Sequence, residues 1–127
     1  MQAILNIELD EKAGPGLDVA ARYEKVMRAV RRFFTRAVGE IQIAGYDGPD
    51  GSAAEHTAVI VFEFHASKNI VLQAANQLSR EFNQDCVALL FDDGEGRLVG
   101  PEADRWGGFK LEYFKSPAIL NLFKEAA

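Results

Sequence analysis

Few residues in this sequence supply soft or nitrogen donor atoms for a metal ion. The two histidines, His56 and His65, and the single cysteine, Cys86, supply its soft and nitrogen donor atoms. His65 shares one face of a predicted strand with Glu63, and Cys86 opens another predicted strand. A structural zinc site needs four ligands, usually in two closely spaced pairs, and the sequence has no CxxC or HxxxH pair. We therefore expect no metal site and no cofactor.

The sequence also shows no recognisable catalytic motif. Cys86 precedes four apolar residues and follows Asp85, whose negative charge disfavours a thiolate, so we expect a buried structural thiol. The acidic segment 92–95 lacks the alternating ligand order of a calcium loop and predicts a hairpin turn. No pair of carboxylates stands out elsewhere. The sequence therefore assigns no catalytic residue.

The most unusual feature is the charge of a predicted helix over residues 19–38. With its capping residue Asp18 it carries six basic and two acidic residues, a net charge of +4, whereas the rest of the chain carries −9. Like charges one helical turn apart repel by a few tenths of a kcal/mol per pair, roughly, so we expect something anionic over this face. Three occupants remain open: the protein's own acidic loops, an acidic protein or second subunit, and nucleic acid. The six predicted binding residues are Arg22, Lys25, Arg28, Arg31, Arg32 and Arg36.

A second candidate binding segment lies near the C-terminus. Trp106 is followed by two glycines and flanked by Arg105 and Phe109. Trp and Arg are frequent anchors of protein interfaces, which favours a contact surface. The alternative is a loop that places Trp106 over the open end of the core.

Hydrophobic periodicity predicts the elements that hold these residues. Alternation predicts strands at residues 3–9, 41–43, 57–65 and 86–91, with a return strand at 97–99. A period of 3.6 predicts the helix 19–38, closed by Gly39, and a second helix after Ser67 with an inward stripe of small and apolar residues. Residues 46–51 predict a loop, and Ser116-Pro117 predicts a short terminal helix bearing Ile119, Leu120 and Phe123.

This order predicts an α+β fold. We expect a ferredoxin-like split β-α-β-β-α-β antiparallel sheet with two helices on one face, plus a C-terminal hairpin and short helix. The length of 127 residues, 48% of them hydrophobic, predicts a single domain, 1–127, with a core at 3–91 and a C-terminal extension at 92–127. One thiol and an N-terminus without a basic region predict a cytoplasmic protein without a membrane partner.

The segment 96–114, together with the small size of the chain, resembles small uncharacterised proteins of bacteriophages and prophages. This resemblance implies a host-directed or accessory binding role. It includes no motif tied to chemistry.

These observations predict a non-enzymatic module that acts through protein–protein contacts, with another protein or with a second copy of itself. The first alternative is a dimeric ferredoxin-like small-molecule-binding protein or enzyme, with His65, Tyr46 and Tyr113 as polar groups. The second alternative is nucleic-acid binding through the basic helix 19–38. The net charge of −5 and the pI near 5.0 oppose that second alternative.

The nucleic-acid alternative has a direct test. If the basic helix binds DNA or RNA, replacing Arg28 and Arg32 with Glu reverses two charges at the contact and abolishes retention on a nucleic-acid column. Unchanged retention eliminates this alternative.

Overall fold

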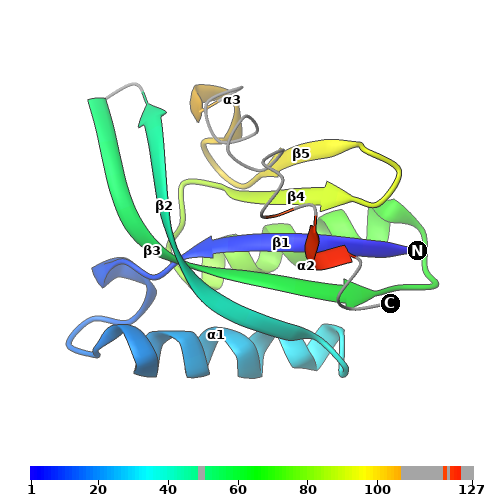
Figure 1. Ribbon diagram of the computed structural model, residues 1–127, viewed down its shortest axis with the longest axis horizontal. Coiled ribbons are helices and arrows are strands. Elements are labelled where there is room, and N and C mark those ends of the chain that lie inside the picture. Colours follow the sequence, from blue (N-terminus) through cyan, green and yellow to red (C-terminus); the bar gives the residue numbers. More distant parts are fainter. Residues whose placement is uncertain (49–50, 107–118, 120, 124–127) are drawn as a thin grey trace.

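A five-stranded antiparallel sheet in the order β2-β3-β1-β4-β5 is the framework of the protein (Figure 1). The computed structural model describes residues 1–48, 51–106, 119 and 121–123. Its strands are β1 (Gln2–Glu8), β2 (Val38–Gly48), β3 (Gly51–Glu63), β4 (Val87–Phe91) and β5 (Gly96–Val99). Its helices are the 3-10 turn η1 (Glu11–Ala13), α1 (Val19–Phe33), α2 (Lys68–Glu81) and α3 (Ala103–Trp106). The predicted α+β class is confirmed.

Strand β1 is the centre of the sheet. It pairs with β3 on one side and with β4 on the other, so that Leu5 lies opposite both Ile60 and Leu89. Residues 3–7 are all buried, because both faces of the strand are covered. Successive side chains of β1 point to opposite faces of the sheet, and each face has its own hydrophobic core.

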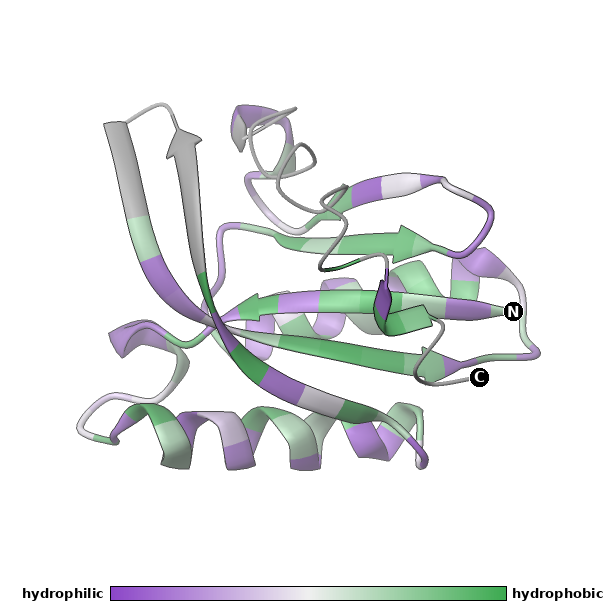
Figure 2. Ribbon diagram, viewed as in Figure 1, coloured by the Kyte–Doolittle hydropathy of each residue, from purple (hydrophilic) through white to green (hydrophobic). Residues whose placement is uncertain are grey.

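The larger core lies between the sheet and the two long helices. Ala3, Leu5 and Ile7 of β1 join this core, and both α1 and α2 contribute to it. Phe34, just after α1, stacks on Phe62 of β3 with ring centroids 3.9 Å apart. In Figure 2 the hydrophobic colour concentrates on β4, on β1 and on the part of β3 that pairs with β1. The predicted inward stripe of the second helix is confirmed as Val71, Ala74, Ala75, Leu78 and Phe82, all buried.

A smaller core lies on the opposite face of the sheet. Ile119, fully buried, packs there together with Leu122 and Phe123. The sheet residues beneath are Ile4, Val59, Val61, Ala88 and Leu90. Residues 119 and 121–123 are helical, in agreement with the predicted terminal helix, whereas Leu120 lies outside the described residues. The C-terminal segment therefore covers the apolar half of this face.

The predicted end of the first helix is wrong. α1 ends at Phe33, and Phe34 has a non-helical backbone (φ −133°, ψ 89°). The chain then turns, with Nε of Arg31 donating to the carbonyl of Ala37 at 3.1 Å. Gly39 belongs to β2, where a Cβ would lie 3.1 Å from the carbonyl oxygen of Val59. This glycine is needed for close packing and does not cap the helix.

The predicted loop at residues 46–51 is also wrong for the part that the structure describes. β2 continues to Gly48 and β3 begins at Gly51, with these two residues paired. Residues 49–50 lie outside the described residues. Because β1 pairs with β3 only over residues 57–63, the outer part of the β2–β3 hairpin projects beyond β1 as a two-stranded ribbon (Figure 1).

Three further sequence-based predictions concern the chain as a whole. Cys86 is buried and forms no disulfide within the described part of the chain, as expected. Among the described residues, no helix combines the length and the apolar character that crossing a bilayer requires. β5, from the predicted extension, adds a strand to the sheet, and the division into a core and an extension stays a prediction.

Gly100 offers a test of the packing between β5 and β4. It has a positive φ of +144°, and an added Cβ would lie 2.8 Å from both the carbonyl oxygen of Asp85 and the Cα of Cys86. We predict that Gly100→Ala lowers the free energy of unfolding by about 2–3 kcal/mol, because the clash is with backbone atoms. Chemical denaturation measures this loss.

Gly94→Ala is the matched control. Gly94 also has a positive φ, +94°, but an added Cβ would meet nothing within 4 Å. Its loss should stay near 1 kcal/mol, roughly the cost of the backbone conformation alone. Equal losses for the two variants would contradict the packing described here.

Candidate functional site

Three carboxylates meet where β1 ends. One oxygen from each of Glu8, Asp10 and Glu55 lies within 4.8 Å of the others, and all three residues are half-buried. We call them the acidic cluster. Glu8 is the last residue of β1, and its register partner on β3 is Thr57, two residues after Glu55. Residues two apart on a strand share a face, so Glu55 lies beside Glu8 on the face opposite the long helices.

The acidic cluster is electrostatically strained. Burial raises the pKa of Asp10 above its usual value, and the negative charge of Glu8 raises it further. Hydrogen bonds to the Asp10 carboxylate oppose these effects, and the backbone N–H of Ala13 donates one of them at 3.2 Å. Asp10 is thereby fixed in place. A positive charge placed among the three carboxylates would relieve their repulsion.

This arrangement can bind a cation or accept a proton. In the described part of the chain it is the one group of three or more side chains whose ligand atoms converge in this way. Carboxylate oxygens suit hard divalent metals, and they suit organic cations equally. The sequence analysis missed the cluster because Glu55 is distant from Glu8 and Asp10 in the sequence. The alternation of Glu8 and Asp10 directly after an apolar strand was the signal that could have found it.

Asn6 lies next to the acidic cluster on the same face of β1. It is only 8% exposed, and its Nδ2 finds no hydrogen-bond partner within the described part of the chain. Its neighbours across the sheet are Val59 and Ala88, both apolar. A buried donor without an acceptor lowers the free energy of unfolding by about 1–3 kcal/mol, so this amide destabilises the folded protein.

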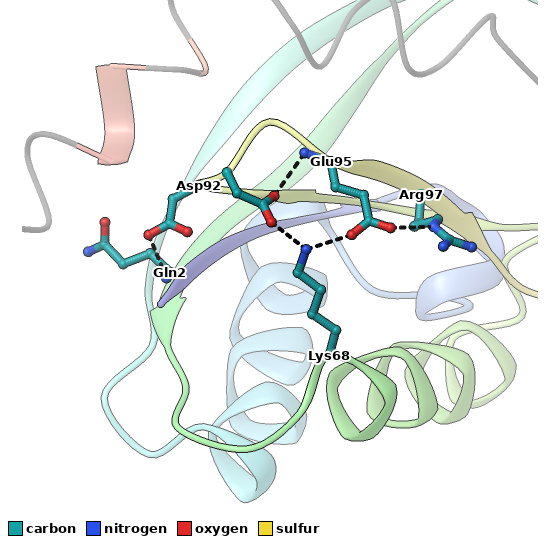
Figure 3. A network of polar contacts seen from close by, with 6 residues as sticks. Gln2, Lys68, Asp92, Glu95 and Arg97 are labelled. Carbon is teal, nitrogen blue, oxygen red and sulfur yellow. Dashed lines mark hydrogen bonds and ion pairs between the residues drawn. The ribbon is translucent and has the colours of Figure 1, made fainter.

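A second polar network serves the fold (Figure 3). Nζ of Lys68, at the start of α2, pairs with Asp93 and lies 2.6 Å from Oε2 of Glu95. The other oxygen of Glu95, Oε1, accepts from Nε of Arg97 at 2.9 Å. The backbone N–H of Gln2 donates to the carboxylate of the neighbouring Asp92 at 2.9 Å. These contacts hold the β4–β5 turn against α2 and the start of β1. The predicted hairpin turn at 92–95 is present, and its acidic charge is paired.

Hydrogen bonds from Lys68 lower the pKa of both carboxyl groups that it contacts, Asp93 and Glu95, and raise the pKa of Lys68 itself. Asp93 is exposed and Lys68 and Glu95 are partly exposed, so salt screens their attraction. This network needs no ligand to satisfy it.

Three of the six basic residues predicted to form a binding surface on the first helix have partners within the protein. Arg22 bonds to the carbonyls of Gly14 and Leu9 and pairs with Glu11, so it anchors the loop before α1. Arg31 is bonded to the turn after α1, and Arg32 pairs with Glu81 of α2 at 2.6 Å. The remaining three predicted binding residues are Lys25, Arg28 and Arg36. All three are exposed, and Arg36 lies beyond the end of α1. Binding by this surface stays a prediction.

The predicted aromatic segment is described only in part. Arg105 and Trp106 belong to α3, and Arg105 lies 3.5 Å from the carboxylate of Glu102. Phe109 lies outside the described residues, so the role of this segment stays a prediction. His56 and His65 are both exposed, His56 within β3 and His65 two residues after its end.

The fold has counterparts among solved structures, although neither a protein-family model nor a curated protein matches the sequence. A phage SAM lyase in complex with S-methyl-5'-thioadenosine is 16% identical, with a TM-score of 0.51, over 69% of this chain and 76% of that one. The apo state of phage SAM lyase is 17% identical, with a TM-score of 0.49, over 69% and 75% of the two chains. At 16% identity, the likeness to the first of these structures shows a shared fold and nothing more.

This likeness corrects the main functional prediction from the sequence. The expected non-enzymatic protein-binding module has the fold of an enzyme instead. The misleading features were the charge of the first helix and the lack of a catalytic motif. Three of the six basic side chains are tied into the fold, and the acidic cluster forms only when distant segments meet. The comparison favours the first alternative, a small-molecule-binding protein or enzyme.

Removing the charge of Glu8 should stabilise the protein by an amount that depends on pH. Folding raises the pKa of Asp10, so its contribution is greatest when it is protonated and is lost as the pH rises through the folded-state pKa. Glu8→Gln removes part of the repulsion. We predict that this variant raises the free energy of unfolding at pH 7, by at most about 1 kcal/mol because the site is half-exposed. Near pH 3, roughly, most carboxyls are protonated and the gain should vanish.

Denaturant unfolding at both pH values measures the effect. Glu63→Gln is the control, since Glu63 is exposed at the opposite end of β3. An equal change at both pH values for Glu8→Gln would contradict a repulsive cluster.

Proposed function

We propose that the protein is an enzyme that binds S-adenosylmethionine and cleaves it, releasing S-methyl-5'-thioadenosine. The observation that carries this proposal is the acidic cluster, which offers converging, half-buried carboxylates to a cationic ligand. The shared fold with a phage SAM lyase supports the choice of this ligand among organic cations.

The charge of the ligand changes during such a reaction. S-adenosylmethionine has a positively charged sulfonium, and breaking its bond to the amino-acid chain leaves the electron pair on sulfur, which gives a neutral thioether. The carbon that loses sulfur takes its new bond from the substrate's own carboxylate oxygen and closes a lactone, so no further reactant is needed. Carboxylates therefore attract the substrate more strongly than the nucleoside product. They favour substrate binding and product release, and they do not by themselves lower the barrier, because the positive charge is fading in the transition state.

We also propose that the framework is ferredoxin-like. The order of the first four strands in the sheet supports this, since β4 and β3 flank β1 and β2 lies outside β3. The chain order supports it too, with α1 between β1 and β2 and α2 between β3 and β4. On this framework the long helices occupy one face, which leaves the polar end of the other face to the ligand.

The first prediction is the activity itself. Incubation of the purified protein with S-adenosylmethionine should release S-methyl-5'-thioadenosine at a rate proportional to protein concentration, measured by chromatography with mass detection. A buffer-only reaction gives the background rate. Release at the background rate, together with no calorimetric binding of either molecule, would contradict the proposal.

The second prediction assigns the acidic cluster to substrate binding. Glu55→Gln removes one of three attracting charges, so we predict that KM for S-adenosylmethionine rises roughly tenfold, the size of one charge-assisted contact. We expect kcat to change much less, because the lost attraction acts on the bound substrate. Glu63→Gln should leave both constants unchanged. A large fall in kcat at constant KM would assign Glu55 to the chemical step instead.

A further inference from the structure

The amide of Asn6 is the one group at this site that the proposed role of the acidic cluster does not use. Its Nδ2 is buried and unpaired within the described part of the chain. Asn6 and Glu8 are two residues apart on β1, so their side chains share a face and lie about 7 Å apart along the strand. An unsatisfied donor beside a ligand site is expected to find its acceptor on the ligand.

The surroundings restrict what that acceptor is. Asn6 lies between Val59 and Ala88, with Ile4 next on its own strand face, so the wall around the amide is apolar. An anionic acceptor at this position would be repelled by the neighbouring acidic cluster. A neutral acceptor on a flat, mostly apolar group fits both conditions. The nucleoside half of an adenosyl sulfonium has this chemistry, because its base presents ring nitrogens as neutral acceptors.

We propose that Asn6 recognises the adenosine half of the ligand by donating a hydrogen bond from Nδ2 to a neutral acceptor. The acidic cluster then holds the cationic half. This assignment rests on the proposed function. It makes Asn6 a specificity-determining residue and divides the site into a neutral part and a charged part along β1.

Two probe molecules separate these parts. S-methyl-5'-thioadenosine contains the adenosine half without a charge, and S-methylmethionine contains the sulfonium and amino-acid half without adenosine. Asn6→Leu removes the donor at nearly constant size. We expect it to weaken binding of S-methyl-5'-thioadenosine roughly tenfold, about 1.4 kcal/mol, and to leave that of S-methylmethionine within about twofold. Glu55→Gln should show the reverse pattern.

Stability provides a readout that a purely structural role would not give. Asn6→Leu removes a buried unpaired donor, so its Tm should stay equal to that of the wild type or rise. Asn6→Ala is a second variant in case leucine does not fit. Asn69→Leu, at an exposed amide of α2, is the matched control and should bind both probes as the wild type does.

The outcomes separate this inference from the proposed function. If the wild type binds neither S-adenosylmethionine nor S-methyl-5'-thioadenosine, the proposed function is wrong and this inference is wrong with it. If the wild type binds both and the Asn6 variants bind S-methyl-5'-thioadenosine equally well, a buried water satisfies Asn6, and only this inference is overturned. Equal weakening of both probes in the Asn6 variants would also overturn it, since that pattern indicates a structural role.

Discussion

The structure depends on the burial of β1 on both faces. This strand pairs with β3 and β4, and its odd-numbered residues join the core beneath α1 and α2. Its other face needs a second cover, because Ile4 and its neighbours on β3 and β4 are apolar. Ile119, Leu122 and Phe123 of the C-terminal segment supply that cover over the apolar half of the face.

The position of the candidate site follows from this constraint. Beyond Ile4 the same face of β1 becomes polar, first at Asn6 and then at Glu8. There β3 runs past the end of β1 and brings Glu55 to the cluster, while Asp10, just before η1, is fixed by a hydrogen bond from the backbone N–H of Ala13. The rigid centre of the sheet thus places carboxylates from two distant segments with little freedom to separate. Burial and the negative charge of Glu8 raise the pKa of Asp10, so a cationic ligand bound there would favour its ionised form.

Most of the fold could be predicted from hydrophobic periodicity alone. The stripe on α2 and the alternation in β1 are strong patterns, because one apolar face of each element packs into the core beneath the long helices. The errors arose where tertiary contacts overrode local signals. Phe34 leaves the helix to stack on Phe62, which ends α1 early, and Gly39 is small because β2 passes close to α1.

The site was much harder to predict. A basic helix is visible in the sequence, whereas the pairing of Arg22 and Arg32 with Glu11 and Glu81 is visible only in three dimensions. The same holds for the acidic cluster, whose members lie at the end of β1, just before η1 and on β3. No local pattern shows that β3 extends past β1, and this extension is what brings Glu55 to Glu8.

The central claim is that an adenosyl sulfonium binds at the polar end of β1. The most direct measurement is a titration of isotope-labelled protein with S-adenosylmethionine, followed by amide and side-chain NMR shifts. The account predicts saturable shifts concentrated at Asn6, Glu8, Asp10 and Glu55, with the side-chain amide of Asn6 among the most affected. Shifts confined to the exposed cations of α1, or no shifts at millimolar ligand, would contradict it.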